Sequence, residues 1–187
     1  MPDSSVYDNM RDEFAKGYLQ VYTGAGKGKT TAAIGLSVRA LGAGMNVFFA
    51  QFIKGAKYSE FDALEKLSAK GSFTHKQYGR GCFIMREPEQ ADIDAARDGL
   101  ADALKEMKSG KYRLVVLDEA NVAVALKLLT KEELLDFASQ RPENVELLIT
   151  GRGASEELKD IADLVTEMWE IKHYYQKGVM ARRGIES

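Results

Sequence analysis

The sequence predicts a three-layer α/β domain with a mostly parallel sheet. Strand-like and helix-like segments alternate along the chain, a glycine-rich loop separates the first strand from the first helix, and a later apolar strand ends in two carboxylates. Strands that alternate with helices are typical of a parallel sheet covered on both faces. The 187 residues suffice for one such domain.

The first segments form a strand, loop, helix and strand. Residues 18–23 are rich in β-formers and stop at a glycine cluster, which is typical of a strand. Residues 30–41 are expected to form a helix that ends at Gly42. Residues 46–52 are largely apolar, as buried parallel strands are. This order is a βαβ unit.

The rest of the chain continues the alternation. Residues 88–108 carry an apolar stripe at helical spacing. Thr130 begins a capping box, Thr-Lys-Glu-Glu, for a helix that runs to residue 138. Trp169, on the last strand, is expected in the core. The remaining expected elements are helices at 60–67 and 154–163 and strands at 73–78, 113–117, 145–150 and 164–171.

Composition excludes several classes of function. With 26 basic and 28 acidic residues, the net charge of −2 gives no general basic field for nucleic acid or an anionic membrane. One cysteine and two histidines supply no zinc cluster. The first residues lack the basic and apolar run of a signal peptide, and no apolar stretch approaches the ~20 residues that span a bilayer. We therefore expect a cytoplasmic protein that binds neither nucleic acid nor membrane.

Residues 23–31, TGAGKGKTT, resemble the phosphate-binding pattern G-x-x-x-x-G-K-[ST]. Residues 28–30 fit the pattern, but the first position is Thr23 rather than glycine. Glycines let backbone N–H groups converge on phosphate oxygens, and the following helix adds its positive end. Lys29 is expected to neutralise the outer phosphates, and the hydroxyl of Thr30 is expected to ligate Mg²⁺.

A second motif belongs to the same kind of site. Residues 113–117 form an apolar strand that continues into Asp118 and Glu119. A carboxylate at the end of a buried strand is the partner of a phosphate loop, where it holds the metal directly or through water. The two motifs together predict a P-loop NTPase-like domain.

Four blocks, in order along the chain, resemble the ATP:corrinoid adenosyltransferases. They are residues 22–33, with the same departure at the first glycine, then 116–121, 148–154, and a C-terminal signature within 162–186. The resemblance covers about residues 17–187. It implies a recombinase-like parallel sheet, a homodimer, Mg²⁺, ATP and a corrinoid substrate.

The resemblance also implies the reaction. The Co(I) ion of a reduced corrinoid attacks the 5′ carbon of the ATP ribose, triphosphate leaves, and a separate reductase supplies the Co(I). The product serves the synthesis or salvage of coenzyme-form cobalamin. Because Co(I) is a strong nucleophile, the protein needs no general base. It has to orient ATP, neutralise the departing triphosphate and exclude water.

The predicted site contains residues of three kinds. The catalytic residues are Lys29, Thr30 and Glu119. The residues that bind nucleotide or corrinoid are Gly24, Ala25, Gly26, Lys27, Gly28, Lys29, Thr30, Thr31, Arg152 and Phe83. The metal ligands are Thr30, Asp118 and Glu119.

Phe83 lies in a loop where the better-known family members carry a Phe and a Trp that push the lower axial ligand off cobalt. This chain has Cys82, Phe83 and Ile84 there and no Trp. The route of ligand displacement and the preferred corrinoid therefore stay open.

Residues 1–16 stand apart from the domain at 17–187. Val6, Met10 and Phe14 have roughly helical spacing. Given the dimeric habit implied by the resemblance, we expect this segment to cover the partner's active site. A frayed terminus is the equally open alternative.

Two other functions are compatible with the motifs. The first is a motor or regulatory ATPase in which Glu119 polarises a water for attack on the γ-phosphate, although no arginine finger or partner-binding insertion is evident in the sequence. The second is a non-catalytic carrier of nucleotide or corrinoid. The phosphate product separates the three, because it is triphosphate for the adenosyltransferase, orthophosphate for the ATPase and none for the carrier.

Overall fold

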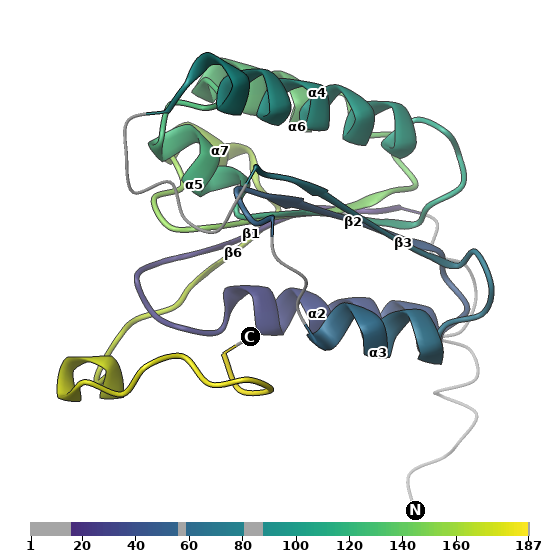
Figure 1. Ribbon diagram of the computed structural model, residues 1–187. Coiled ribbons are helices and arrows are strands. Elements are labelled where there is room, and N and C mark those ends of the chain that lie inside the picture. Colours follow the sequence, from purple (N-terminus) through teal and green to yellow (C-terminus); the bar gives the residue numbers. More distant parts are fainter. Residues whose placement is uncertain (1–15, 56–58, 81–87, 187) are drawn as a thin grey trace, which may run out of the picture.

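The computed structural model describes residues 16–55, 59–80 and 88–186, which form a three-layer α/β domain (Figure 1). In these residues six strands make one sheet in the order β3-β2-β4-β5-β1-β6, and every pairing is parallel. Helices α2 and α3 cover one face, and α4 to α7 cover the other. The predicted fold class is confirmed.

The strands are short and the helices vary more in length. The strands are β1 (Leu19–Thr23), β2 (Val47–Phe52), β3 (Phe73–Tyr78), β4 (Leu114–Asp118), β5 (Glu146–Thr150) and β6 (Leu164–Glu167). The helices are α2 (Lys29–Gly42), α3 (Ser59–Leu67), α4 (Gln90–Met107), α5 (Ala120–Ala125), α6 (Lys131–Ser139) and α7 (Glu156–Ile161), with a 3₁₀ turn at Tyr174–Lys177.

Most predicted elements lie within two residues of the observed ones, and two differ. Helix α5 was not predicted, because it follows β4 after a single linking residue and carries no cap signal in the sequence. Strand β6 ends at Glu167 rather than at 171, because the chain then leaves the sheet to support the phosphate loop. The expectation that Trp169 lies in the core was wrong, since 78% of it is exposed.

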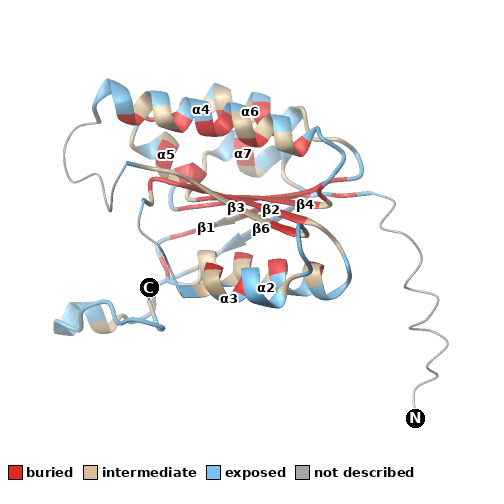
Figure 2. Cartoon of the chain, turned by 45° about the vertical axis from the view of Figure 1, so that its right-hand side comes forward, coloured by how far each residue is buried: buried red, intermediate tan, exposed pale blue. Residues whose placement is uncertain are grey.

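The central strands of the sheet are buried, in contrast to the edge strand β6. Every residue of β2, β4 and β5 is buried, whereas every residue of β6, at one edge, is exposed (Figure 2). Well-packed central strands hold the side chains at their carboxyl ends in fixed positions. No helix in the described part of the chain is long and apolar enough to cross a membrane.

The predicted segment 1–16 lies outside the described residues, except for Lys16. The Lys16 ammonium lies over the ring of Tyr18, 5.5 Å from its centroid. Whether the segment covers a partner's site stays a prediction.

His75 on β3 is a partly buried histidine among aromatic rings. Its ring stacks on Phe61 with centroids 3.6 Å apart, and its Nε2 has no hydrogen-bond partner among the described residues. Burial lowers the pKa of His75 from 6.5 to about 4, although Asp118 opposes the shift. Protonation of this ring is therefore unfavourable in the folded protein.

This environment predicts a loss of stability in mild acid. The His75 ring takes up a proton near pH 6.5 in the unfolded chain but only near pH 4 in the folded protein. The contribution of neutral His75 to the free energy of unfolding is therefore complete above pH 6.5 and is lost as the pH falls to 4. The loss should reach roughly 2–3 kcal/mol. His75→Phe keeps a ring on Phe61 and removes the titration, so its urea midpoint should fall less between pH 7.5 and 4.5. Equal falls in both proteins would contradict the assignment.

Candidate functional site

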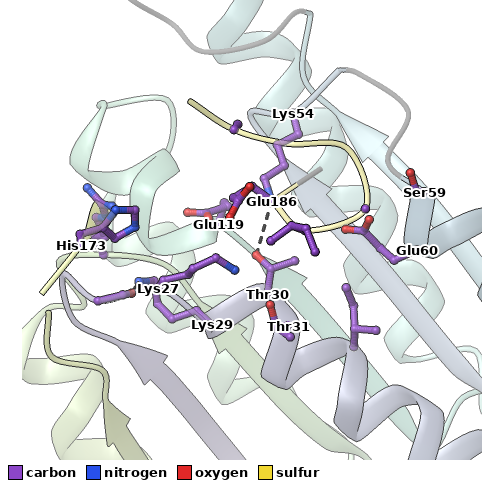
Figure 3. A pocket seen from close by; sticks show the side chains of 17 residues that line it. Lys27, Lys29, Thr30, Thr31, Lys54, Ser59, Glu60, Glu119, His173 and Glu186 are labelled. Atoms are coloured by element: carbon purple, nitrogen blue, oxygen red, sulfur yellow. Dashed lines mark hydrogen bonds between the residues drawn. The ribbon is translucent and has the colours of Figure 1, made fainter. Parts of the chain in front are cut away.

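A cavity of about 680 Å³ lies at the carboxyl edge of the sheet (Figure 3). The loop between β1 and α2 forms one side of it, and β2, β4 and β5 contribute residues from just beyond their ends. The C-terminal segment also reaches it, through Ala181 and residues 184–186. Ligands of open α/β sheets bind at this edge, so the cavity is the candidate site.

The phosphate loop rests on the backbone that follows β6. The N–H of Gly26 donates to the carbonyl of Met168 (2.7 Å), and the N–H of Met168 donates to the carbonyl of Thr23 (2.9 Å). A Cβ atom on Gly24 would lie 2.3 Å from the Met168 oxygen, and one on Gly26 would lie 2.8 Å from it. Both positions therefore require glycine for this close approach.

Thr23, which replaces the first glycine of the pattern, has a structural role. It is the last residue of β1 and is buried, and its hydroxyl accepts a hydrogen bond from the N–H of Ala154 (3.2 Å). The positive φ angle comes one residue later, at Gly24 (φ 94°). Threonine is therefore compatible with the loop and ties it to the segment after β5.

Lys29 is the buried cation of the loop. Its ammonium donates to the carbonyl oxygens of Gly24 (2.8 Å) and Gly26 (2.7 Å). Burial lowers the pKa of Lys29, while the negative charge of Glu119 opposes the shift. Because Lys29 is the first residue of α2, its charge adds to the positive end of that helix. The arrangement suits a polyphosphate.

Asp118 lies at the centre of a hydrogen-bonded cluster and is fully buried. Its Oδ1 accepts from the hydroxyls of Thr150 (2.7 Å) and Thr30 (2.9 Å). Its Oδ2 accepts from the amide of Gln51 (3.0 Å) and forms an ion pair with the ammonium of Lys54 (3.3 Å). Four side chains from α2, β5 and the end of β2 thus hold one carboxylate.

Glu119 faces the cavity and Asp118 does not. The φ angle of Glu119 is +62°, which is uncommon for a residue other than glycine and turns it away from its neighbour. Its N–H donates to the hydroxyl of Thr150 (3.1 Å). Burial and the charge of Asp118 raise the pKa of Glu119, whereas Lys54 and nearby cations lower it. The motif therefore supplies two carboxylates with different surroundings.

The structure brings most of the predicted site residues to this cavity. Gly26, Lys27, Gly28, Lys29, Thr30, Thr31, Glu119 and Arg152 line it. Asp118 lies just outside it, behind Thr30. Gly24 and Ala25 are on the same loop but do not line the cavity, since Gly24 packs on Met168 instead. Phe83 lies outside the described residues.

Several residues of the site were missed by the sequence analysis. Gln51 and Thr150 contact Asp118 from neighbouring strands, and the signal for them is their place at the strand ends. Lys54, two residues after the end of β2, also lines the cavity and was not among the predicted site residues. The other lining residues that were not predicted are Ile34, Ser59, Glu60 and Ala181, while His173, Gly184, Ile185 and Glu186 line the cavity from within the C-terminal signature.

The C-terminal segment is fixed by its own contacts. Glu186 accepts hydrogen bonds from the backbone N–H of Arg182 (2.8 Å), from the guanidinium of the same residue (3.1 Å) and from the hydroxyl of Tyr174. These bonds lower the pKa of Glu186 to about 2. Glu186 lines the cavity together with the phosphate loop and Glu119, so the C-terminal segment forms part of the cavity wall (Figure 3).

Known proteins resemble this chain along nearly its whole length. A family model described as "ATP:corrinoid adenosyltransferase BtuR/CobO/CobP" matches residues 15–187. The corrinoid adenosyltransferase of Pseudomonas aeruginosa is 36% identical over 176 residues, which are 94% of this chain and 85% of that protein. The corrinoid adenosyltransferase CobA of Salmonella typhimurium is 36% identical over 172 residues, which are 91% of this chain and 86% of that protein.

An uncharacterized protein of Nostoc is 34% identical over 179 residues. The matched part is 90% of this chain but only 47% of the Nostoc protein, so the chain spans about half of that relative's length. The matched region of all three relatives includes the loop and the carboxylate strand that meet at the cavity, because it covers at least nine-tenths of this chain. With the family model matching 15–187 as well, the chain belongs to the ATP:corrinoid adenosyltransferase family.

Proposed function

We propose that this protein transfers the 5′-deoxyadenosyl group of ATP to the Co(I) ion of a corrinoid and releases triphosphate. The observation that carries the proposal is the meeting of the Lys29 loop with the Thr30–Asp118 pair at one cavity, in a chain of this family. The ATPase alternative has no support among the relatives with a named activity, since the proteins of Pseudomonas aeruginosa and Salmonella typhimurium are both named corrinoid adenosyltransferases.

The proposed reaction does not require the protein to act as a general acid or base. Co(I) supplies the electron pair for the new cobalt–carbon bond, and the bond from the ribose 5′ carbon to oxygen breaks to release triphosphate. The protein has to stabilise that leaving group. Lys29, Lys27, Lys54 and Arg152 bring four cationic side chains to the cavity, together with the N-terminus of α2.

Mg²⁺ is part of the proposal. The hydroxyl of Thr30 and the carboxylates of Asp118 and Glu119 are hard oxygen donors of the kind that Mg²⁺ prefers. The described residues contain no group of three or more His, Cys, Asp or Glu side chains arranged as a metal cage. That fits Mg²⁺, which protein sites typically hold through one or two carboxylates and the phosphates of the substrate. Bound there, the ion adds positive charge beside the leaving triphosphate.

Product analysis tests the proposed reaction against ATP hydrolysis. We expect ³¹P NMR of an anaerobic reaction with ATP, Mg²⁺ and chemically reduced cobalamin to show triphosphate. The same mixture without reduced cobalamin should leave ATP intact. Orthophosphate and ADP that form equally in both mixtures would sink the adenosyltransferase proposal and restore the ATPase.

The corrinoid is expected to approach from the open side of the cavity, beside Arg152. A contact between the corrinoid and Phe83 stays a prediction. A separate cytoplasmic reductase is proposed to supply Co(I). A comparison of cobalamin with cobinamide as the acceptor would show which corrinoid is preferred and whether the enzyme serves synthesis or salvage.

We also propose a homodimer. Strand β6 pairs on one side only, with β1, and its Leu164 and Val165 are 44% and 41% exposed. Trp169 and Ile171, which follow it, are 78% and 97% exposed. An exposed strand edge flanked by apolar side chains is typical of an association surface. A second copy of the chain fits this surface.

Within that dimer, residues 1–16 are proposed to cover the partner's site. Deletion of residues 1–16 should then weaken the binding of corrinoid more than that of ATP, because ATP is held by the phosphate loop of its own chain. Isothermal titration of both ligands against the full and truncated proteins measures the difference. Unchanged affinity for both ligands would show that the segment is only a tail.

A further inference from the structure

Lys54 contacts two of the three groups that are expected to hold the metal, Thr30 and Asp118. Its ammonium lies 3.3 Å from Oδ2 of Asp118 and 3.4 Å from the hydroxyl of Thr30. Figure 3 shows it reaching Thr30 from the side of the cavity opposite Lys29. Of the four side chains in the described structure that donate to Asp118, only Lys54 carries a charge. It is the counter-ion of a fully buried carboxylate.

The backbone before Lys54 is bent so as to aim it there. The N–H of Lys54 donates to the carbonyl of Phe52 (2.7 Å), which closes a three-residue turn with Ile53 at φ +69°. A positive φ angle is unfavourable for a β-branched residue and persists only where the surroundings enforce it. Here Gly79 packs against the turn so closely that a Cβ atom would lie 2.4 Å from the Ile53 carbonyl.

An ammonium and a divalent cation cannot share this position. Both would be bound to the same hydroxyl and the same carboxylate oxygen, and their repulsion is weakly screened in a site where Asp118 is fully buried. The Lys54 side chain is 20% exposed, and its four-carbon stem is flexible enough to swing into the cavity that it lines. A polyphosphate bound in that cavity carries the negative charge with which a displaced Lys54 ammonium would form an ion pair.

We propose that Lys54 exchanges partners during substrate binding, leaving Asp118 for the triphosphate of ATP as Mg²⁺ takes its place. The inference rests on the proposed function and adds a positioning residue to it. The metal alone binds weakly because it must displace the ammonium of Lys54 from Asp118. Metal and polyphosphate together bind well because the phosphate charge attracts the displaced ammonium. Lys54 thereby couples the two binding events.

Two substitutions separate the parts of this inference. Lys54→Met keeps the length of the side chain and removes its charge. Lys54→Gln removes the charge but keeps a hydrogen-bond donor for Asp118, so it guards against a variant that fails to fold. Mn²⁺, in place of Mg²⁺, reports metal binding by electron paramagnetic resonance. Inorganic triphosphate, titrated calorimetrically with Mn²⁺ present, reports anion binding. Lys27→Met is the matched control, because Lys27 lines the same cavity from the phosphate loop.

The two affinities should move in opposite directions. We expect both Lys54 variants to bind Mn²⁺ alone at least tenfold more tightly than the unmodified protein, and triphosphate at least tenfold more weakly. Lys27→Met should weaken the binding of triphosphate and leave the affinity for Mn²⁺ unchanged. If Lys54 had only a structural role, its substitution would weaken the binding of both ligands or of neither, and either result overturns the inference. If the unmodified protein binds no Mn²⁺–triphosphate at all, the proposed ATP site itself is wrong.

Discussion

Replacement of Lys29 by alanine should abolish productive use of ATP. The loss of one buried positive charge beside the departing triphosphate should remove at least about 2–4 kcal/mol of transition-state stabilisation, by analogy with single oxyanion donors. That corresponds to a decrease in kcat/KM of about thirtyfold to a thousandfold. The measurement is the rate of adenosylcobalamin formation from chemically reduced cobalamin over a range of ATP concentrations.

Lys27→Ala is the control for this variant. Lys27 is exposed, whereas Lys29 is buried and bound to two carbonyl oxygens of the loop. Water screens the exposed charge, so its removal should have a much smaller effect. Wild-type-like adenosylation by Lys29→Ala would show that the loop does not hold the leaving group. Circular dichroism and the urea midpoint of each variant exclude misfolding as the cause.

Replacement of Asp118 by alanine should destabilise the fold by about 2–4 kcal/mol in the absence of ligands. The carboxylate is fully buried and satisfies two hydroxyls, one amide and the Lys54 ammonium. Its removal leaves these donors without their acceptor beside a small cavity. The partial exposure of Lys54 keeps the effect below that of breaking a fully buried ion pair. The urea midpoint measures the loss.

Asp118→Asn should cost less stability while still losing the metal. With its oxygen toward Gln51 and Lys54, the new amide nitrogen faces the hydroxyls of Thr30 and Thr150, which accept hydrogen bonds as well as donate them. The new amide therefore keeps a polar contact with all four side chains, although the two hydroxyl hydrogens lose their acceptor and the negative charge is gone. If Asp118→Ala unfolds at the wild-type urea concentration, the cluster around Asp118 contributes nothing to stability.

The parts of this molecule that the sequence predicts are those with local causes. The strand predicted at residues 73–78 is observed with the predicted bounds and is followed directly by Gly79. Thr130 and Glu133 form the predicted capping box, which depends on four consecutive residues. The phosphate loop is also local, because a strand, a glycine-rich turn and a lysine at the start of a helix follow one another directly.

The parts that escaped prediction depend on which strands are neighbours. Thr150 and Gln51 contact Asp118 only because β4 lies between β2 and β5, an order that local patterns do not specify. The wall formed by Ala181 and residues 184–186 depends on a chain reversal after β6. The sequence motif marked Glu186 as part of a family block but gave it no position.

Trp169 shows that a strand residue cannot be assigned to the core unless the position of its strand in the sheet is known. An apolar residue on a strand is normally assigned to the core, and this assignment failed because β6 lies at the edge and the chain leaves the sheet after Glu167. Within one chain the side chain is 78% exposed. The proposed dimer would account for a large apolar side chain at that position.

The most direct test of the central claim is a single-turnover reaction with enzyme, ATP, Mg²⁺ and chemically reduced cobalamin in the absence of oxygen. The visible spectrum follows the cobalt–carbon product, and the triphosphate is counted in the same sample. The account predicts one adenosylcobalamin and one triphosphate per active site. ATP consumed to ADP at the same rate with and without the reduced corrinoid, and with no cobalt–carbon product, would contradict it.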